Sequence, residues 1–161
     1  MTYNHYYNTI CLKGKINNIQ FSHESNSKQY YKAIITTEDS QNFQIKFRED
    51  KLDYFKENEE IGFIGNLRLF NKQLYIYVKE IADFSNDNIS RQTEIYGSVT
   101  KKDNRFNSYV VYCGGDTYIP VKSKNDYEVN QEIKVTGLFT SRQFTKKDSD
   151  EVFTTYEVIE G

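Results

Sequence analysis

Hydrophobic and polar residues alternate along most of this chain with the period of two that is typical of β-strands. The alternation is clearest from Asn58 to Ile81, where apolar residues occupy one parity on both sides of the polar turn 71–73. This arrangement predicts a β-hairpin with one buried face. Gly65 stands in the middle of its first strand, and glycine in a strand interior usually marks a bulge or a bend. We therefore expect the chain to bend there.

Three more strands are predicted before this hairpin, over about 9–16, 29–37 and 43–48. The polar segment 22–27 is predicted as a loop. The charged segment 50–60 fits a compact loop or a single helical turn. With the hairpin, the first half of the chain therefore contains five strands.

The second half repeats this order. Residues 130–137 match residues 58–65 in the pattern N-x-E-I-x-hydrophobic-x-G. The match places Gly137 where Gly65 stands, and we expect a second bend there. Further strands are predicted over 95–99, 109–113, 118–122 and 152–159, with a polar hairpin loop over 141–151 before the last of them.

Two copies of one supersecondary unit follow from this repeat. We expect a first domain over residues 1–85, a linker over 86–90 and a second domain over 91–161. The apolar parity of the strands supplies the predicted core: Leu12, Ile16, Ile45, Phe63, Leu67, Ile76, Val78, Val99, Val111, Val121, Val135 and Val158.

Composition agrees with an all-β protein, because the strand formers Tyr, Phe, Ile, Val and Thr are common while Ala occurs twice. The 161 residues include 21 basic and 23 acidic side chains, for a net charge of −2. This balance does not favour nucleic acid as a partner, and a binding face for it would have to be built by segregating charge. No apolar run is long enough to span a membrane, and no signal peptide is read, so we expect a cytoplasmic protein.

Each half resembles an OB-fold, the five-stranded Greek-key barrel that binds oligonucleotides and oligosaccharides. The residues that carry the resemblance are the glycine-centred strands Leu12-x-Gly14-x-Ile16, Ile61-x-Phe63-x-Gly65-x-Leu67, Ile95-x-Gly97-x-Val99 and Ile133-x-Val135-x-Gly137-x-Phe139. The expected fold class is all-β, with two tandem five-stranded OB-fold-like Greek-key barrels.

Within that superfamily the chain looks most like the single-stranded DNA-binding and primosomal proteins of bacteria and their phages. The resemblance implies a single-stranded DNA partner, or RNA, with a role in replication or recombination and contacts to replication proteins. The chain departs from the housekeeping bacterial protein in having no Gly-rich segment and no acidic tail. Its Asn-, Lys- and Ile-rich composition suggests AT-rich coding, as in a phage or mobile element.

Single strands are bound by stacking bases on aromatic rings while Lys and Arg follow the phosphates. In the first unit, shared parity on neighbouring strands predicts a binding face made of Lys46, Arg48, Arg68, Phe70, Tyr75 and Tyr77. In the second unit, basic residues interleaved with aromatic ones supply further candidates: Arg105, Phe106, Tyr118, Lys122, Arg142 and Phe144.

Two alternatives stand beside this interpretation. The Tyr-rich face of the first unit is equally suited to packing against the second unit. The near-neutral charge also fits a protein-protein module, either an adaptor or an inhibitor that mimics nucleic acid.

The sequence offers little for catalysis. His5 and His23 lie near no nucleophile and show no metal-ligand spacing, and Cys11 and Cys113 are too few and too far apart for a zinc site or a disulfide framework. No Gly-rich phosphate loop, HExxH or GxSxG motif is present. We expect no enzymatic activity, no cofactor and no metal.

Overall fold

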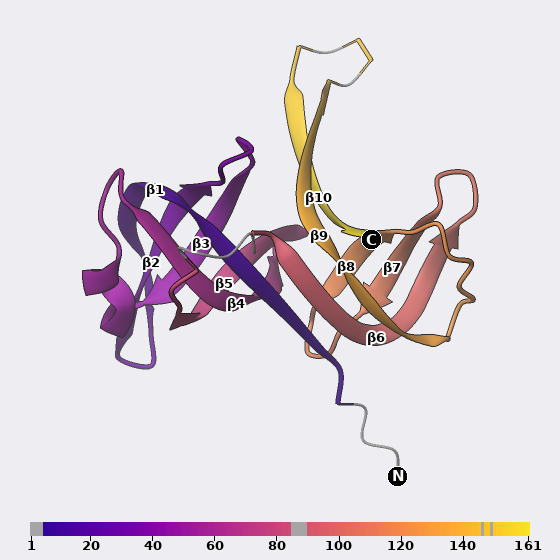
Figure 1. The fold of residues 1–161 in the computed structure, drawn as a ribbon, viewed down its shortest axis with the longest axis horizontal. Coiled ribbons are helices and arrows are strands. Elements are labelled where there is room, and N and C mark those ends of the chain that lie inside the picture. Colours follow the sequence, from indigo (N-terminus) through magenta and orange to yellow (C-terminus); the bar gives the residue numbers. More distant parts are fainter. Residues whose placement is uncertain (1–4, 85–89, 146, 149) are drawn as a thin grey trace.

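The computed structural model describes residues 5–84, 90–145, 147–148 and 150–161, and most of them lie in β-strands (Figure 1). The first half contains β1 (Tyr7–Ser25), β2 (Lys28–Thr36), β3 (Asn42–Arg48), β4 (Glu60–Phe70) and β5 (Gln73–Ile81). The second half contains β6 (Gln92–Asp103), β7 (Ser108–Tyr112), β8 (Tyr118–Lys122), β9 (Glu132–Thr145) and β10 (Val152–Glu160). The expected all-β class is confirmed.

Each set of five strands closes into a barrel. In the first barrel β1 pairs with both β2 and β4, and β3 runs parallel to β5 with Ile45 opposite Ile76. In the second barrel β6 pairs with both β7 and β9, and β8 runs parallel to β10 with Val121 opposite Val158. This is the Greek-key topology of the OB-fold in both halves.

The barrel interiors hold the residues that the alternation selected. Every one of the twelve predicted core residues is at most 1% exposed. Period two explains this result, because successive side chains of a strand point to opposite faces and one face of each strand is turned inward. The predicted helical turn is also present, as a 3-10 helix over Glu49–Tyr54.

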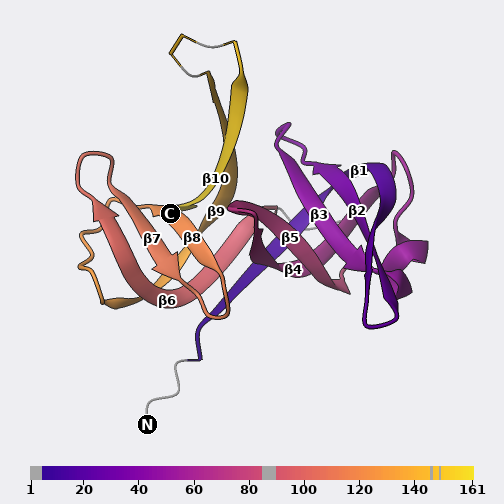
Figure 2. The ribbon, with the colours of Figure 1, turned by 180° about the vertical axis from the view of Figure 1, so that it is seen from behind.

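Two predicted loops begin too early, because residues 22–25 of the first and 141–145 of the second are strand. β1 continues to Ser25 and turns at Asn26 and Ser27, which have positive φ angles of 52° and 63°. β9 and β10 extend beyond the second barrel as a two-stranded ribbon, over 140–145 and 152–157, in which Phe144 lies opposite Phe153 (Figures 1 and 2). Most of these residues are exposed or half-buried, so the alternation that marks a half-buried strand is missing from the sequence.

The two barrels are joined through their first strands. The beginning of β1 pairs antiparallel with the beginning of β6, with Tyr7 opposite Tyr96 and Cys11 opposite Gln92. All ten strands therefore belong to one sheet. β1 crosses from the second barrel into the first, as Figure 1 shows.

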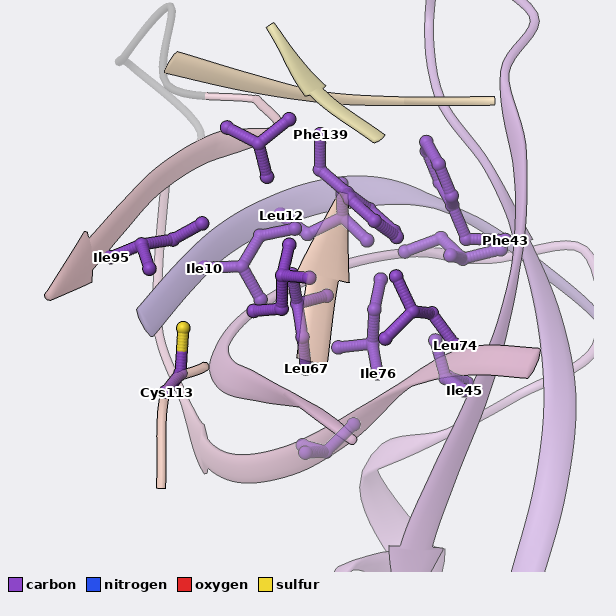
Figure 3. Close-up of a cluster of buried hydrophobic side chains, with 14 of the residues drawn as sticks. Ile10, Leu12, Phe43, Ile45, Leu67, Leu74, Ile76, Ile95, Cys113 and Phe139 are labelled. Carbon is purple, nitrogen blue, oxygen red and sulfur yellow. The ribbon is translucent and has the colours of Figure 1, made fainter. Parts of the chain in front are cut away.

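Apolar side chains from both barrels meet beneath this pairing (Figure 3). The ring of Phe43 from β3 stacks on that of Phe139 from β9 at 5.0 Å, and Phe139 stacks on Tyr156 of β10 at 5.7 Å. Ile10 and Ile95, one from each first strand, are fully buried in the same hydrophobic cluster. We call Ile10, Phe43, Ile95, Phe139 and Tyr156 the junction core.

Hydrogen bonds also connect the two barrels at the edge of the junction core. Arg91 donates a 2.6 Å hydrogen bond from Nη2 to Asp39 of the first barrel and one of 3.1 Å from Nη1 to the carbonyl of Phe139. The side-chain oxygen of Gln41 accepts hydrogen bonds from the backbone N–H and the hydroxyl of Ser141, at 2.7 and 2.8 Å. The expected linker over 86–90 falls, apart from Ser90, outside the described residues, and the domain boundaries stay a prediction.

The two mid-strand glycines are places where backbones approach closely. A Cβ on Gly65 would lie 2.3 Å from the Tyr77 carbonyl oxygen, and one on Gly137 would lie 2.1 Å from that of Ile159. A register shift at Gly65 makes Lys79 the extra residue of a bulge in β5, whereas the ladder at Gly137 shows no shift. The expected irregularity is thus present at Gly65, while Gly137 shows the close approach without a bulge.

Replacing Gly65 with Val should lower the free energy of unfolding by more than the roughly 1 kcal/mol that strand propensity and chain entropy explain. The added side chain would collide with the backbone carbonyl of Tyr77, which is held in the sheet and cannot move aside as a flexible side chain could. Chemical denaturation measures the effect, with Gly161→Ala as control, since a Cβ there meets only the Thr136 carbonyl at 4.0 Å. Equal stability of the two variants would contradict the close approach.

Replacing Phe43 with Ala should cost about 3–5 kcal/mol of unfolding free energy, because it leaves a cavity in the junction core. Phe106→Ala is the matched control, because Phe106 is 61% exposed and its loss should change stability by no more than about 0.5 kcal/mol. A cost for Phe43→Ala as small as that of the control would show that the barrels do not depend on this contact.

Candidate nucleic-acid interface

The six residues predicted in the first unit gather on the outer surface of the first barrel. β5 lies between β3 and β4, and it places Lys46 opposite Tyr77 and Arg68 opposite Tyr75. These side chains have the parity opposite to that of the buried residues, so they point away from the barrel interior. We call the surface formed by Lys46, Arg48, Arg68, Phe70, Tyr75 and Tyr77 the aromatic-basic face.

Cations and aromatic rings alternate on this face at contact distance. Lys46 Nζ lies 4.5 Å from the centre of the Tyr75 ring and 4.8 Å from that of Phe70. Arg68 Cζ lies 3.8 Å from the centre of the Tyr77 ring. These are cation-π geometries, which orient the charged groups without neutralising them. Phe70 stays 61% exposed.

Two of the three cations keep their charge unpaired. Among the described residues, no carboxylate forms a salt bridge with Lys46 or Arg68, whereas Arg48 pairs with Asp50 at 2.9 Å. The Arg48 guanidinium beside Asp50 holds the pKa of that carboxyl well below its usual range. Partial burial, and then the charge of Lys32, lower the pKa of Lys46. An anion bound at this face would relieve the repulsion between the two lysines.

A groove of about 560 Å³ adjoins the face on the β2 side. Its walls include Lys32, which lies opposite Lys46 on the neighbouring strand, and Gln44. At its far end the His23 ring stacks on Tyr30 at 4.8 Å, with 6° between the ring planes. The sequence interpretation missed these four residues. The outward parity of Tyr30, Lys32 and Gln44 on β2 and β3 would have placed them on the same surface. His23 could not be placed there, because its segment was predicted as a loop and not as a strand.

The aromatic-basic face is distinct from the packing between the barrels. The barrels meet through the β1-β6 pairing and the junction core, which includes none of the six residues of the face. Arg68 and Tyr75 border the second barrel across an open groove. In this structure the barrels therefore do not pack on the aromatic-basic face, and its role in binding stays a prediction.

The six residues predicted in the second unit are not brought together. Arg105 and Phe106 lie in the β6-β7 turn, Tyr118 and Lys122 lie at the two ends of β8, and Arg142 and Phe144 lie on β9 in the ribbon (Figure 1). Acidic neighbours pair both arginines, with Asp103 at 3.4 Å from Arg105 and Glu157 at 2.7 Å from Arg142. No face comparable to that of the first barrel results.

Equivalent positions in the two barrels explain this difference, because the strand registers correspond. Four positions of the aromatic-basic face can be compared with their equivalents in the second barrel. One lysine is kept there, whereas one arginine and both tyrosines are replaced. The pairs, first barrel before second, are Lys46 and Lys122, Arg68 and Thr140, Tyr75 and Glu157, and Tyr77 and Ile159. The second barrel thus shares the fold of the first without its surface chemistry.

Within the part of the chain that the structure describes, no three His, Cys, Asp or Glu side chains are grouped closely enough to hold a metal ion. In the same part, the structure contains no helix with the length and apolar character needed to cross a membrane.

Comparison with known proteins places the fold. No protein-family model and no curated protein matches the sequence. The wild-type single-stranded DNA binding protein from Thermus aquaticus superposes with a TM-score of 0.72 at 11% identity, over 97% of this chain and 91% of that one. A deletion mutant of the same protein gives 0.68 at 10% identity, over 98% and 93%.

A shorter match covers one half of the chain. The N-terminal domain of the PriB protein from Thermoanaerobacter tencongensis aligns with a TM-score of 0.42 at 20% identity, over 47% of this chain and 93% of that one. The two full-length superpositions show that this chain shares the fold of the Thermus aquaticus protein along nearly its whole length.

Proposed function

We propose that this protein binds single-stranded nucleic acid, DNA in the first place, through the aromatic-basic face of the first barrel. The observation that carries the proposal is the arrangement of Lys46 and Arg68. Each cation has no carboxylate partner among the described residues and lies over an aromatic ring on an exposed sheet surface. Rings that stack on bases, beside cations that meet phosphates, are what a single strand requires.

The shared fold supports the proposal. Thermus aquaticus single-stranded DNA binding protein has the same fold, and its name states its ligand. The net charge of −2 is compatible with binding, because the charge that matters is local. Several basic side chains of the second barrel are paired with carboxylates, among them Lys102, Lys134 and Arg142.

The finer parts of the proposal depend on the sequence. Replication or recombination is the process in which we propose that the protein acts, in the cytoplasm and without catalysis of its own. RNA as an alternative strand, replication proteins as partners, and a phage or mobile-element origin are proposed on the same basis.

A protein partner is the second candidate, and exposed apolar residues of the second barrel favour it. Leu138 of β9 lies opposite Ile159 of β10, and these two side chains are 41% and 37% exposed. They stand where the first barrel has Asn66 and Tyr77. On this hypothesis the second barrel docks a protein, with or without a strand on the first.

Replacing Tyr75 with Ala should weaken the binding of fluorescent oligo-dT by about 1–3 kcal/mol, because the lost stacking surface has no substitute. Fluorescence anisotropy at low salt measures the affinity. Tyr118→Ala, outside the face, is the control and should bind like wild type. Wild-type affinity of Tyr75→Ala would contradict the stacking role.

Replacing Arg68 with Ala should reduce the slope of log affinity against log salt by about 0.7, since one fewer counterion is released from a single strand. Arg142→Ala is the matched control, because Arg142 is already paired with Glu157. The slope of Tyr75→Ala should stay that of wild type. If oligo-dT does not bind at all at low salt, the proposed function is wrong, and this result favours the hypothesis of a protein partner.

A further inference from the structure

A second groove, of about 540 Å³, lies between the two barrels. One wall comes from β4 and β5 of the first barrel, and the other from the start of β1 and the β7-β8 turn. We call it the inter-barrel groove and define it by Tyr6, Tyr7, Asn66, Arg68, Tyr75 and Lys79.

The inter-barrel groove continues the aromatic-basic face. Arg68 and Tyr75 belong to both, since they lie opposite each other on β4 and β5 at the boundary between them. A strand that runs over Lys46 and Tyr75 therefore meets the groove at Arg68 without leaving the protein surface.

Asn66 gives the groove an unsatisfied hydrogen-bonding group. Its side-chain oxygen is buried and has no hydrogen-bond partner among the described residues. A buried acceptor without a partner costs free energy, and such atoms are rare in folded proteins. The Asn66 side chain lines the groove, but its oxygen is covered by the protein, so a ligand donor can reach it only after this side chain turns towards the groove. The equivalent residue of the second barrel is Leu138, which carries no such group.

The opposite wall offers rings that are held in place. Tyr6 and Tyr7 both lie edge-on to Tyr96, with ring centres 5.4 and 5.9 Å away. The Tyr6 hydroxyl donates to Glu132 and the Tyr7 hydroxyl to Glu94, each over 3.0 Å. Rings anchored at both ends lose little freedom when a ligand binds, which favours recognition.

The two walls of the groove differ in charge and in backbone conformation. Arg68 and Lys79 place two cations on the first-barrel wall, and Lys79 is turned out there as the extra residue of the β5 bulge. The β7-β8 turn across from them has two glycines at positive φ and the carboxylate of Asp116. Phosphates are attracted to the first wall and repelled by Asp116, while the two glycines of the turn leave room for a ligand.

We infer that the inter-barrel groove receives one nucleotide of the bound strand. Its phosphate lies at Arg68 and Lys79, and its base lies against Tyr6 and Tyr7. The Asn66 side chain turns towards the groove when the strand binds, and its oxygen then accepts a hydrogen bond from a base N–H. This inference depends on the proposed function and extends it: the strand crosses from the first barrel to the second, although the second has no aromatic-basic face of its own.

Photo-cross-linking tests this path. Oligo-dT carrying 5-iodouracil at successive positions is irradiated on the full chain, and mass spectrometry identifies the attached residues. A cross-link to Tyr6 or Tyr7 supports the inference. Binding with cross-links confined to Phe70, Tyr75 or Tyr77 overturns it and leaves the proposed function intact. Absence of binding at low salt overturns both.

Replacing Asn66 with Ala tests the hydrogen bond. The variant should bind oligo-dT about threefold to tenfold more weakly, as expected for one lost hydrogen bond. It should melt no lower than wild type, because the unsatisfied oxygen is removed. Leu138→Ala, at the equivalent position of β9, should bind like wild type. Wild-type affinity of Asn66→Ala, or a lower melting temperature with unchanged affinity, would overturn the role of Asn66.

Discussion

The antiparallel pairing of β1 with β6 is the interaction on which the rest of this structure depends. β1 forms hydrogen-bonded ladders with β2, β4 and β6, so one strand fixes the closure of the first barrel and the position of the second. A slip of one residue in such a ladder would turn every side chain to the other face. The register therefore sets the stacking of Phe43 on Phe139 and the width of the groove between the barrels.

The two barrels show how one topology supports different surfaces. Inward positions are constrained alike in both halves, since each barrel must fill its interior with apolar side chains. Outward positions carry no such constraint. Tyr75 in one barrel is Glu157 in the other, and this exchange turns a site that can stack a base into one that neutralises Arg142. A fold comparison alone would treat the barrels as equal, whereas the side chains separate them.

The fold and the aromatic-basic face could be predicted from the sequence, because both depend on the alternation of apolar and polar residues within single strands. Lys46, Tyr75 and Tyr77 share a parity on strands that pair in every OB barrel, so their proximity could be predicted. The inter-barrel groove could not be predicted, because it forms between β4 and β5, the start of β1 and the β7-β8 turn, which lie far apart in the sequence. The position of Lys79 in the groove could not be predicted, because it depends on the bulge in β5. The β9-β10 ribbon could not be predicted either, because it has no buried face and so shows no alternation of apolar and polar residues.

The central claim is that the aromatic-basic face of the first barrel binds the strand, while the second barrel repeats the fold without such a face. Amide chemical-shift mapping of the labelled protein, titrated with oligo-dT at low salt, tests it most directly. The account predicts shifts over 44–48 and 66–77, with residues 138–142 and 157–160 unchanged. Equal shifts in the two sets, or shifts confined to the second, would contradict it.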